Sequence, residues 1–142
     1  MNEYIDFIQN HYILSTAWLF VFGLLVYSLF AAKMRGYTSA NPAQATQLIN
    51  QDNAIVLDVR EENEYLKGHI VNAIHMPLGY LKTRINEIEK HKDKPIIVGC
   101  RSGQRSAQAC AILKKHGFES VYNLAGGVMA WQTDNLPLTK KK

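Results

Sequence analysis

The residues with the clearest capacity for chemistry lie in the segment Cys100–Ser106, whose sequence is CRSGQRS. This segment follows the apolar run Ile96–Gly99 and precedes a stretch with helical spacing, so Cys100 is predicted to close a strand and to face the first turn of a helix. Unpaired amides and the helix dipole make such a position electropositive, which favours a thiolate over a thiol. We therefore predict that Cys100 is a reactive nucleophile.

The rest of this segment is suited to holding a negatively charged group beside the cysteine. Two arginines add positive charge, and the glycine between them allows the backbone to curl until successive N–H groups point at one centre. The predicted substrate-binding residues are Arg101, Ser102, Gly103, Gln104 and Arg105. The alternative is a buried, unreactive cysteine at a strand end, which leaves the two arginines and the glycine unexplained.

These residues need a scaffold, and residues 37–138 predict an α/β domain with a mostly parallel central sheet flanked by helices. Short apolar runs alternate with helical patterns, and continuous runs such as Ile96–Gly99 are typical of strands that helices bury on both faces. The predicted strands are 54–59, 73–76, 95–100 and 120–124, and the helical segments are 42–50, 61–67, 78–90 and 104–116. In such sheets ligands bind at the carboxyl ends of the strands, where the sequence places both Asp58 and Cys100.

The N-terminal part of the chain has a different character. Residues 7–32 contain no Asp, Glu, Lys or Arg, and 13–32 form an apolar run of 20 residues. A helix of this length spans roughly 30 Å, the thickness of the hydrocarbon core of a bilayer. The 106 residues after Gly36 could not bury a helix that is apolar on all sides, and a signal peptide would begin with basic residues rather than with Glu3 and Asp6. We predict a retained single-pass transmembrane anchor within residues 1–36.

The charges beside this span predict its orientation. Lys33 and Arg35 follow the span and acidic residues precede it, so the positive-inside rule places the N-terminus outside and residues 37–142 in the cytoplasm. Both cysteines suit a reducing compartment. The net charge of +4 comes largely from a solvated basic tail, 139–142, in which no aromatic residues interleave, so nucleic acid is not a predicted partner. For a bacterial source the expected location is the cell inner membrane.

Several motifs resemble those of the single-domain rhodanese (sulfurtransferase) family, over residues 38–137. The motifs are LDVR (Leu57–Arg60), EENEY (Glu61–Tyr65), GHI (Gly68–Ile70), AIHMP (Ala73–Pro77), CRSGQRS (Cys100–Ser106) and AGGVMAW (Ala125–Trp131). No one motif is specific by itself, but their order and spacing together are. The resemblance implies a rhodanese-like α/β fold, here preceded by one transmembrane helix.

The resemblance also implies a reaction. Cys100 would accept a sulfane sulfur from a donor such as thiosulfate, carry it as a persulfide, and pass it to cyanide or another thiophilic acceptor. Arg101 would attract an anionic donor, and Arg105 would brace the loop or help to bind the donor. Thiosulfate-specific members carry a second basic residue at the position of Ser102. Related Cys-dependent phosphatases need arginine six residues after the cysteine, and here Arg105 lies five after, so the loop suits a sulfur atom better than a phosphate.

Asp58 and Arg60 are predicted to support the site rather than to touch substrate. By resemblance, Asp58 ties the end of its strand to the active loop, and Arg60 pairs with a nearby carboxylate such as Glu64. Cys110 lies roughly 10–15 Å along the following helix, too far for a disulfide with Cys100, and is predicted to pack in the core. No C-x-x-C or H-E-x-x-H motif occurs, so neither a metal nor another cofactor is predicted.

Two functions of different class follow from these features. One is a membrane-anchored sulfurtransferase whose partners are a small sulfur donor, a thiol or cyanide acceptor, and the lipid bilayer through residues 13–32. The other is an interaction or scaffolding module with a rhodanese fold, which works through its anchor and a membrane-protein partner while sulfur transfer is incidental. The intact segment Cys100–Ser106 favours the enzyme, because a scaffold gains nothing from an activated cysteine.

Overall fold

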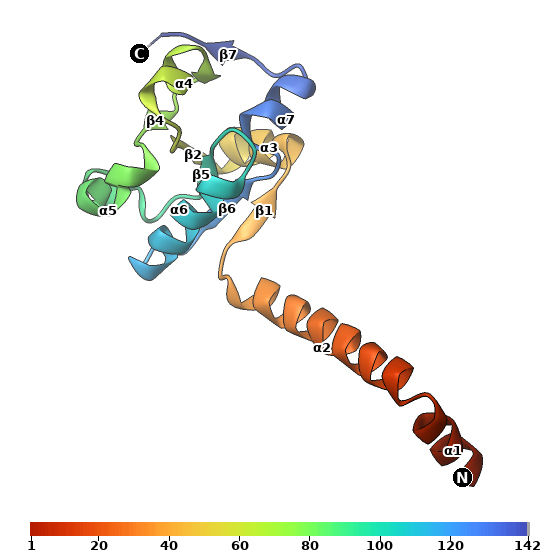
Figure 1. The fold of residues 1–142 in the computed structure, drawn as a ribbon. Helices are drawn as coiled ribbons and strands as arrows, with labels where there is room; N and C mark the ends of the chain where they lie inside the picture. The colour runs from red at the N-terminus through yellow and green to blue at the C-terminus, as the bar shows by residue number, and fades with distance from the viewer. Residues whose placement is uncertain (142) are drawn as a thin grey trace. The chain divides into compact units, whose positions relative to one another are not determined.

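The computed structural model describes residues 1–141, and Lys142, the last residue of the predicted basic tail, lies outside the described residues. The chain divides into an N-terminal unit, Met1–Arg35, and a second unit that begins at Gly36. The N-terminal unit consists of helices α1 (Asn2–Asn10) and α2 (Tyr12–Met34), drawn in red to orange in Figure 1. Within α2, the stretch Tyr12–Ala31 is 20 residues long and, by length and composition, apolar enough to cross a membrane.

The second unit alternates strands and helices, as the sequence predicts. Its elements in chain order are β1 (Thr38–Ala40), α3 (Pro42–Asp52), β2 (Ile55–Asp58), α4 (Glu62–Leu66), β3 (His69–Ile70), β4 (Ile74–His75), η1 (Leu78–Tyr80), α5 (Leu81–Arg84), η2 (Ile85–His91), β5 (Ile96–Gly99), α6 (Gln104–Lys115), β6 (Val121–Leu124), α7 (Gly127–Thr133) and β7 (Leu138–Thr139). The four predicted strands correspond to β2, β4, β5 and β6.

Five strands form the central sheet in the order β1-β6-β5-β2-β4, and all the neighbouring strands within it run parallel. The predicted mostly parallel α/β architecture is therefore confirmed. Strands β3 and β7 form a separate antiparallel pair, in which His69 lies opposite Thr139, a residue in the range predicted as tail. The sheet and its surrounding helices are visible in Figure 1.

The central sheet separates two hydrophobic clusters because successive side chains of a strand point to opposite faces. In β5, Ile96 and Val98 belong to the cluster that also contains Leu113 of α6. Ile97 between them belongs to the second cluster, with Trp131 of α7. Both faces are thus covered by apolar side chains, which explains why β5 is a continuous apolar run rather than an alternating one.

The local signals in the sequence account for some helices better than for others. The predicted start of α3 is confirmed, because the Asn41 side chain accepts a hydrogen bond from the Gln44 amide at 2.8 Å and the Gln44 side chain accepts one from the Asn41 amide at 3.0 Å. The segment 78–90 is helical, as predicted, but it is not one continuous α-helix. Arg84 leaves the α-helical backbone conformation, with a φ of −108° and a ψ of 6°, and the segment is divided into η1, a four-residue α5 and η2.

Candidate active site

The site lies where β2 and β5 end side by side. Asp58 is in register with Gly99, and the amide of Val59 donates to the Gly99 carbonyl at 3.0 Å, so the residues that follow the two strands emerge at the same edge of the sheet. Cys100 is the first residue after β5, and it is only 1% exposed. The structure therefore brings together the two turns that the sequence predicts to form the site.

The loop after Cys100 curls around its sulfur. Gly103 has a φ of 108°, which favours glycine, and in this conformation its amide donates to Cys100 Sγ at 3.0 Å. Burial raises the pKa of the Cys100 thiol, but hydrogen bonds from the Ser106 hydroxyl and from the amides of Ser106, Gly103 and Ser102 outweigh it. The net effect is a pKa below the usual thiol value, in the direction required for a nucleophile.

The hydroxyl of Ser106 connects the cysteine to the neighbouring strand. Ser106 Oγ lies 3.3 Å from Cys100 Sγ and 2.6 Å from Asn123 Oδ1 on β6. The Asn123 side chain also donates from Nδ2 to the Gly103 carbonyl at 3.1 Å, which fixes its orientation and leaves Oδ1 as an acceptor facing Ser106. Ser106 therefore donates its single proton to Asn123 while Cys100 is a thiol, and the same proton can turn to the sulfur when Cys100 is a thiolate, which is the contact that helps to lower the pKa of Cys100.

Helix α7 supports the loop from behind. The amide of Val128 donates to the Cys100 carbonyl at 2.8 Å, and the amide of Met129 donates to the Arg101 carbonyl at 3.2 Å. This close contact between α7 and the loop requires glycine at position 127, because a Cβ there would overlap both carbonyl oxygens and because Gly127 has a φ of 61°. The close packing explains the function of the AGGVMAW motif in the fold: it fixes the backbone of the cysteine.

Arg105 does not point a free charge at the sulfur but is held by Glu64. The guanidinium donates two hydrogen bonds of 2.7 Å to the two carboxylate oxygens, and so links the start of α6 to α4. This contact lowers the pKa of Glu64 to about 2. Of the two roles predicted for Arg105, the geometry matches the bracing of the loop.

Arg60 pairs with a nearby carboxylate, as predicted, but that carboxylate is not the suggested Glu64. Arg60 instead pairs with Asp58 at 2.8 Å, its amide donates to the same carboxylate at 3.0 Å, and its guanidinium donates to the Gly68 carbonyl at 2.8 Å. Because Arg60 precedes α4 instead of lying within it, the spacing between Arg60 and Glu64 does not bring their side chains together. Asp58 also forms no hydrogen bond to the active loop within residues 1–141, so the predicted tie between them is not made.

Cys110 packs in the core, as predicted. It is fully buried in the cluster beneath α6, and burial raises the pKa of its thiol to about 12. Both cysteines are free thiols. In the part of the chain that the structure describes, no three His, Cys, Asp or Glu side chains gather as metal ligands would.

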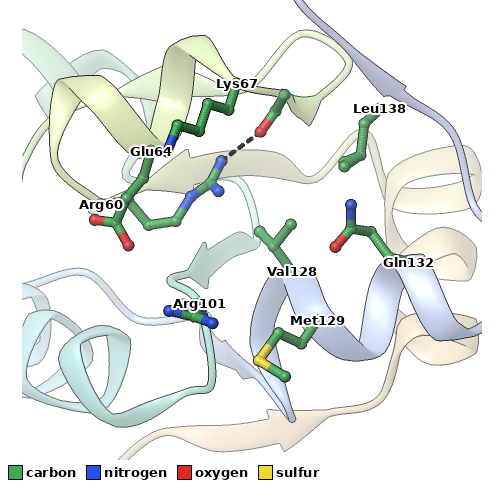
Figure 2. Close-up of a pocket in the computed structure, with 9 residues that line it drawn as sticks. Arg60, Glu64, Lys67, Arg101, Val128, Met129, Gln132 and Leu138 are labelled. Carbon is green, nitrogen blue, oxygen red and sulfur yellow. Dashed lines mark hydrogen bonds between the residues drawn. The ribbon is translucent and has the colours of Figure 1, made fainter.

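A cavity of about 470 Å³ opens beside the loop (Figure 2). One side is formed by Val128, Met129 and Gln132 of α7, and Leu138 lies near them. Residues from the segment around α4 form the other side, namely Arg60, Glu64, Lys67 and Gly68. Arg101, one of the predicted substrate-binding residues, also lines this cavity, whereas Ser102 and Gln104 are exposed on the loop.

The sequence analysis did not identify Ser106 as a partner of the sulfur or Asn123 as the partner of Ser106. A signal for Asn123 was present, because it is a polar residue at the centre of an otherwise apolar strand, and buried polar groups need hydrogen-bond partners. Lys67 and the α7 side chains of the cavity carried no such signal, since only the folded chain brings them next to Arg101.

Comparison with known proteins agrees with this geometry. The Rhodanese-like domain family matches residues 41–134. The chain is 36% identical to YibN of Escherichia coli over the whole of both chains. It is 37% identical over 92 residues to a sulfurtransferase of Allochromatium vinosum, which covers 65% of this chain and 84% of that protein. The crystal structure of a rhodanese-related protein from Thermoplasma volcanium matches with a TM-score of 0.67 and 33% identity, over 74% of this chain and all of that one. The chain belongs to the rhodanese-like domain family.

Proposed function

We propose that this protein is a membrane-anchored sulfurtransferase that carries sulfane sulfur as a persulfide on Cys100. The observation that carries the proposal is the loop geometry: Cys100 Sγ follows a strand, accepts the Gly103 amide at 3.0 Å, and has a pKa below its usual value. These are the properties of an activated nucleophile rather than of a structural cysteine. The Allochromatium vinosum relative, which is named a sulfurtransferase, supports the same role.

The proposed reaction has two half-reactions, written here with thiosulfate as donor. The Cys100 thiolate attacks the outer sulfur of thiosulfate, a new S–S bond forms, and sulfite leaves with the electron pair of the broken bond. An acceptor such as cyanide or a thiolate then attacks the outer sulfur of the persulfide, and the electron pair of that S–S bond returns to Cys100 Sγ. Amides of the loop stabilise the negative sulfur in both states. Arg101 is proposed to attract the anionic donor, and Ser102, Gly103, Gln104 and Arg105 to shape its binding site.

We further propose that α2 holds the protein in the bacterial inner membrane. The helix is 23 residues long, and its 20-residue stretch Tyr12–Ala31 has no buried part. Lys33 and Arg35 at its C-terminal end favour a cytoplasmic position for the residues that follow. In this arrangement residues 1–36 are the anchor, 37–138 the sulfur-carrying domain and 139–142 a basic tail. The anchor would keep the site close to a donor, an acceptor or a protein partner in the membrane.

Turnover and cell function together test this proposal. The full-length protein in detergent should form thiocyanate from thiosulfate and cyanide with the double-displacement kinetics of a covalent carrier. Cys100→Ser should abolish this activity, while Cys110→Ala, the matched change of the other thiol, should retain it. In cells, Cys100→Ser should cause the same defect as deletion of the gene. If Cys100→Ser cells behave as wild type and only removal of residues 1–36 causes a defect, the protein is instead the scaffolding module.

A further inference from the structure

Helix α1 carries exposed apolar side chains along one side. Tyr4, Phe7 and Ile8 follow the spacing of one helical face, and their exposed fractions are 77%, 61% and 55%. At the same spacing, the polar side chains of Asp6 and Asn10 lie on the other side of the helix. Apolar surface in contact with water is unfavourable, so this division into two sides points to an apolar phase that covers one of them.

This helix is separate from α2 rather than its first turns. His11 has a φ of −125° and a ψ of 40°, outside the α-helical range, so the helical path is interrupted for one residue between Asn10 and Tyr12. Figure 1 shows α1 and α2 as two helices joined at this point. The break allows α1 to depart from the direction of the membrane-capable stretch that follows it.

The apolar side of α1 and one flank of α2 together form a groove of about 440 Å³. All but one of its lining residues are apolar, and they come from both helices: Phe7, Ile8, Leu14, Ser15, Trp18 and Leu19. The four from α2 belong to Tyr12–Ala31, the stretch that is apolar enough to cross a membrane. The apolar side of α1 is therefore turned toward the same surroundings as this flank of α2.

The residue types of this region fit the boundary of a bilayer. Tyr4, Tyr12 and Trp18 are of the two types enriched where lipid hydrocarbon meets the headgroups. Helix α1 contains Glu3 and Asp6 but no Lys or Arg, so charge does not attract it to anionic lipids. Because α1 ends two positions before the membrane-capable stretch begins, a bilayer crossed by α2 is the apolar phase within its reach.

We propose that α1 is an interfacial helix, which lies along the headgroup region of the leaflet at the N-terminal end of α2, and that lipid hydrocarbon fills the groove between the two helices. The inference rests on the membrane anchor in the proposed function. Phe7 and Ile8 enter the boundary between headgroups and acyl chains, while Asp6 faces water. Helix α1 thus gives the protein a second contact with lipid and fixes the depth at which α2 enters the bilayer.

Depth-dependent quenching in lipid vesicles tests the inference on the full-length chain. The two native thiols are removed by Cys100→Ser and Cys110→Ala, and one cysteine at a time is introduced and labelled with the fluorophore NBD. The phosphatidylcholine vesicles contain lipids that are spin-labelled either near the headgroup, as a shallow quencher, or near the end of the acyl chain, as a deep one. The labelled variants are Tyr4→Cys and Ile8→Cys on the apolar side of α1, Asp6→Cys and Asn10→Cys on its polar side, and Gly23→Cys within the span, where a Cβ meets no atom within 4 Å.

We expect the shallow quencher to reduce NBD emission more at positions 4 and 8 than at positions 6 and 10, and the deep quencher to act at position 23. Anionic lipid in the vesicles should not strengthen the quenching at positions 4 and 8. With the label at position 4, adding Phe7→Asn should lower the ratio of inserted to water-exposed α1 roughly tenfold, the loss of one buried aromatic side chain. Asp6→Asn, the matched change on the polar side, should not lower this ratio.

The label within the span separates failure of this inference from failure of the anchor. If position 23 is quenched but positions 4 and 8 are quenched no more than positions 6 and 10, this inference fails while the membrane anchor stands. If position 23 is not quenched by either lipid, both fail. A blue-shifted emission at positions 4 and 8 without quenching by lipid would show that a second copy of the chain covers this side of α1, and would also overturn the inference.

Discussion

Replacing Asn123 with leucine should lower the pKa of the Cys100 thiol further below its usual value. In the wild type Asn123 Oδ1, at 2.6 Å, competes with a Cys100 thiolate 3.3 Å away for the single proton of Ser106. Leucine is close to asparagine in size but accepts no hydrogen bond. The freed hydroxyl can then turn toward the sulfur and stabilise its negative charge.

The expected size follows from the strength of this one contact. A hydrogen bond to a charged group contributes about 1.5–3 kcal/mol, and about 1.4 kcal/mol corresponds to a tenfold change in an equilibrium constant. Because the hydroxyl already lowers the pKa of Cys100 in part, the ionisation constant of this thiol should rise by no more than roughly 100-fold. The Gly103 carbonyl, which loses the Asn123 amide, keeps a second partner in the amide of Ala107 at 3.2 Å, so the loop retains its backbone support.

Thiolate absorbance measured against pH provides the assay, with Cys100→Ser as the blank. Burial raises the pKa of Cys110 to about 12, so the second thiol does not contribute to the titration. A double-mutant cycle isolates the mechanism. Ser106→Ala alone should raise the pKa of Cys100, and in the Asn123→Leu background, where the hydroxyl has no competing acceptor, it should raise that pKa by more.

Two outcomes of this cycle would contradict the proposed competition for the Ser106 proton. A pKa that rises in Asn123→Leu would mean that Asn123 supports the thiolate through the loop rather than restraining the Ser106 proton. A fall that persists in the Asn123→Leu, Ser106→Ala double variant would show that the hydroxyl is not the group responsible.

Three further predictions concern the residues around the loop. The pKa of Glu64 is about 2 when folded, against an ordinary value of 4.5, so the stability that its pair with Arg105 provides is present above pH 4.5 and is lost as the pH falls toward 2. Glu64→Gln should therefore lower the free energy of unfolding by about 1–2 kcal/mol at neutral pH in urea denaturation, after allowance for solvent screening. A difference between variant and wild type that does not shrink in acid would contradict this. Gly127→Ala should lower the free energy of unfolding by about 3 kcal/mol in the same measurement and suppress sulfur loading. Gly79→Ala is the control, because a Cβ there meets no atom within 4 Å, and it should change the free energy of unfolding little. Equal losses in the two variants would argue against the close contact of Gly127 with the loop. Sulfur loading in stopped flow should rise with pH and have its midpoint below the ordinary pKa of a thiol, and a midpoint at or above that value would contradict the lowered pKa of Cys100.

The sequence predicted the sheet well where strands were apolar and long enough to form a pattern. The run around Ile96–Gly99 was placed correctly because burial on both faces leaves a continuous apolar signature. Strands β3 and β7 were not predicted, since each has only two residues and is defined by its pairing with the other. Such pairing depends on tertiary contacts rather than on local sequence.

The site was predictable to the level of its backbone but not of its ion pairs. The helix start, the glycine and the position of the cysteine are local features of Cys100–Ser106. The partners of Arg60 and Arg105 are not local. Glu64 is bound to Arg105, 41 positions later in the chain, and this choice depends on how α4 and α6 pack around the strand ends. A spacing rule for helices could not identify that partner, because it applies only within one helix.

Intact mass measurement of the full-length protein tests the central claim most directly. The protein in detergent is exposed to thiosulfate and then to cyanide, with Cys100→Ser and Cys110→Ala treated in parallel. We expect the gain of one sulfur atom on the wild type and on Cys110→Ala, its loss after cyanide, and no gain on Cys100→Ser. A gain that survives in Cys100→Ser, or no gain on the wild type with thiosulfate or polysulfide, would contradict the assignment of Cys100 as the sulfur carrier.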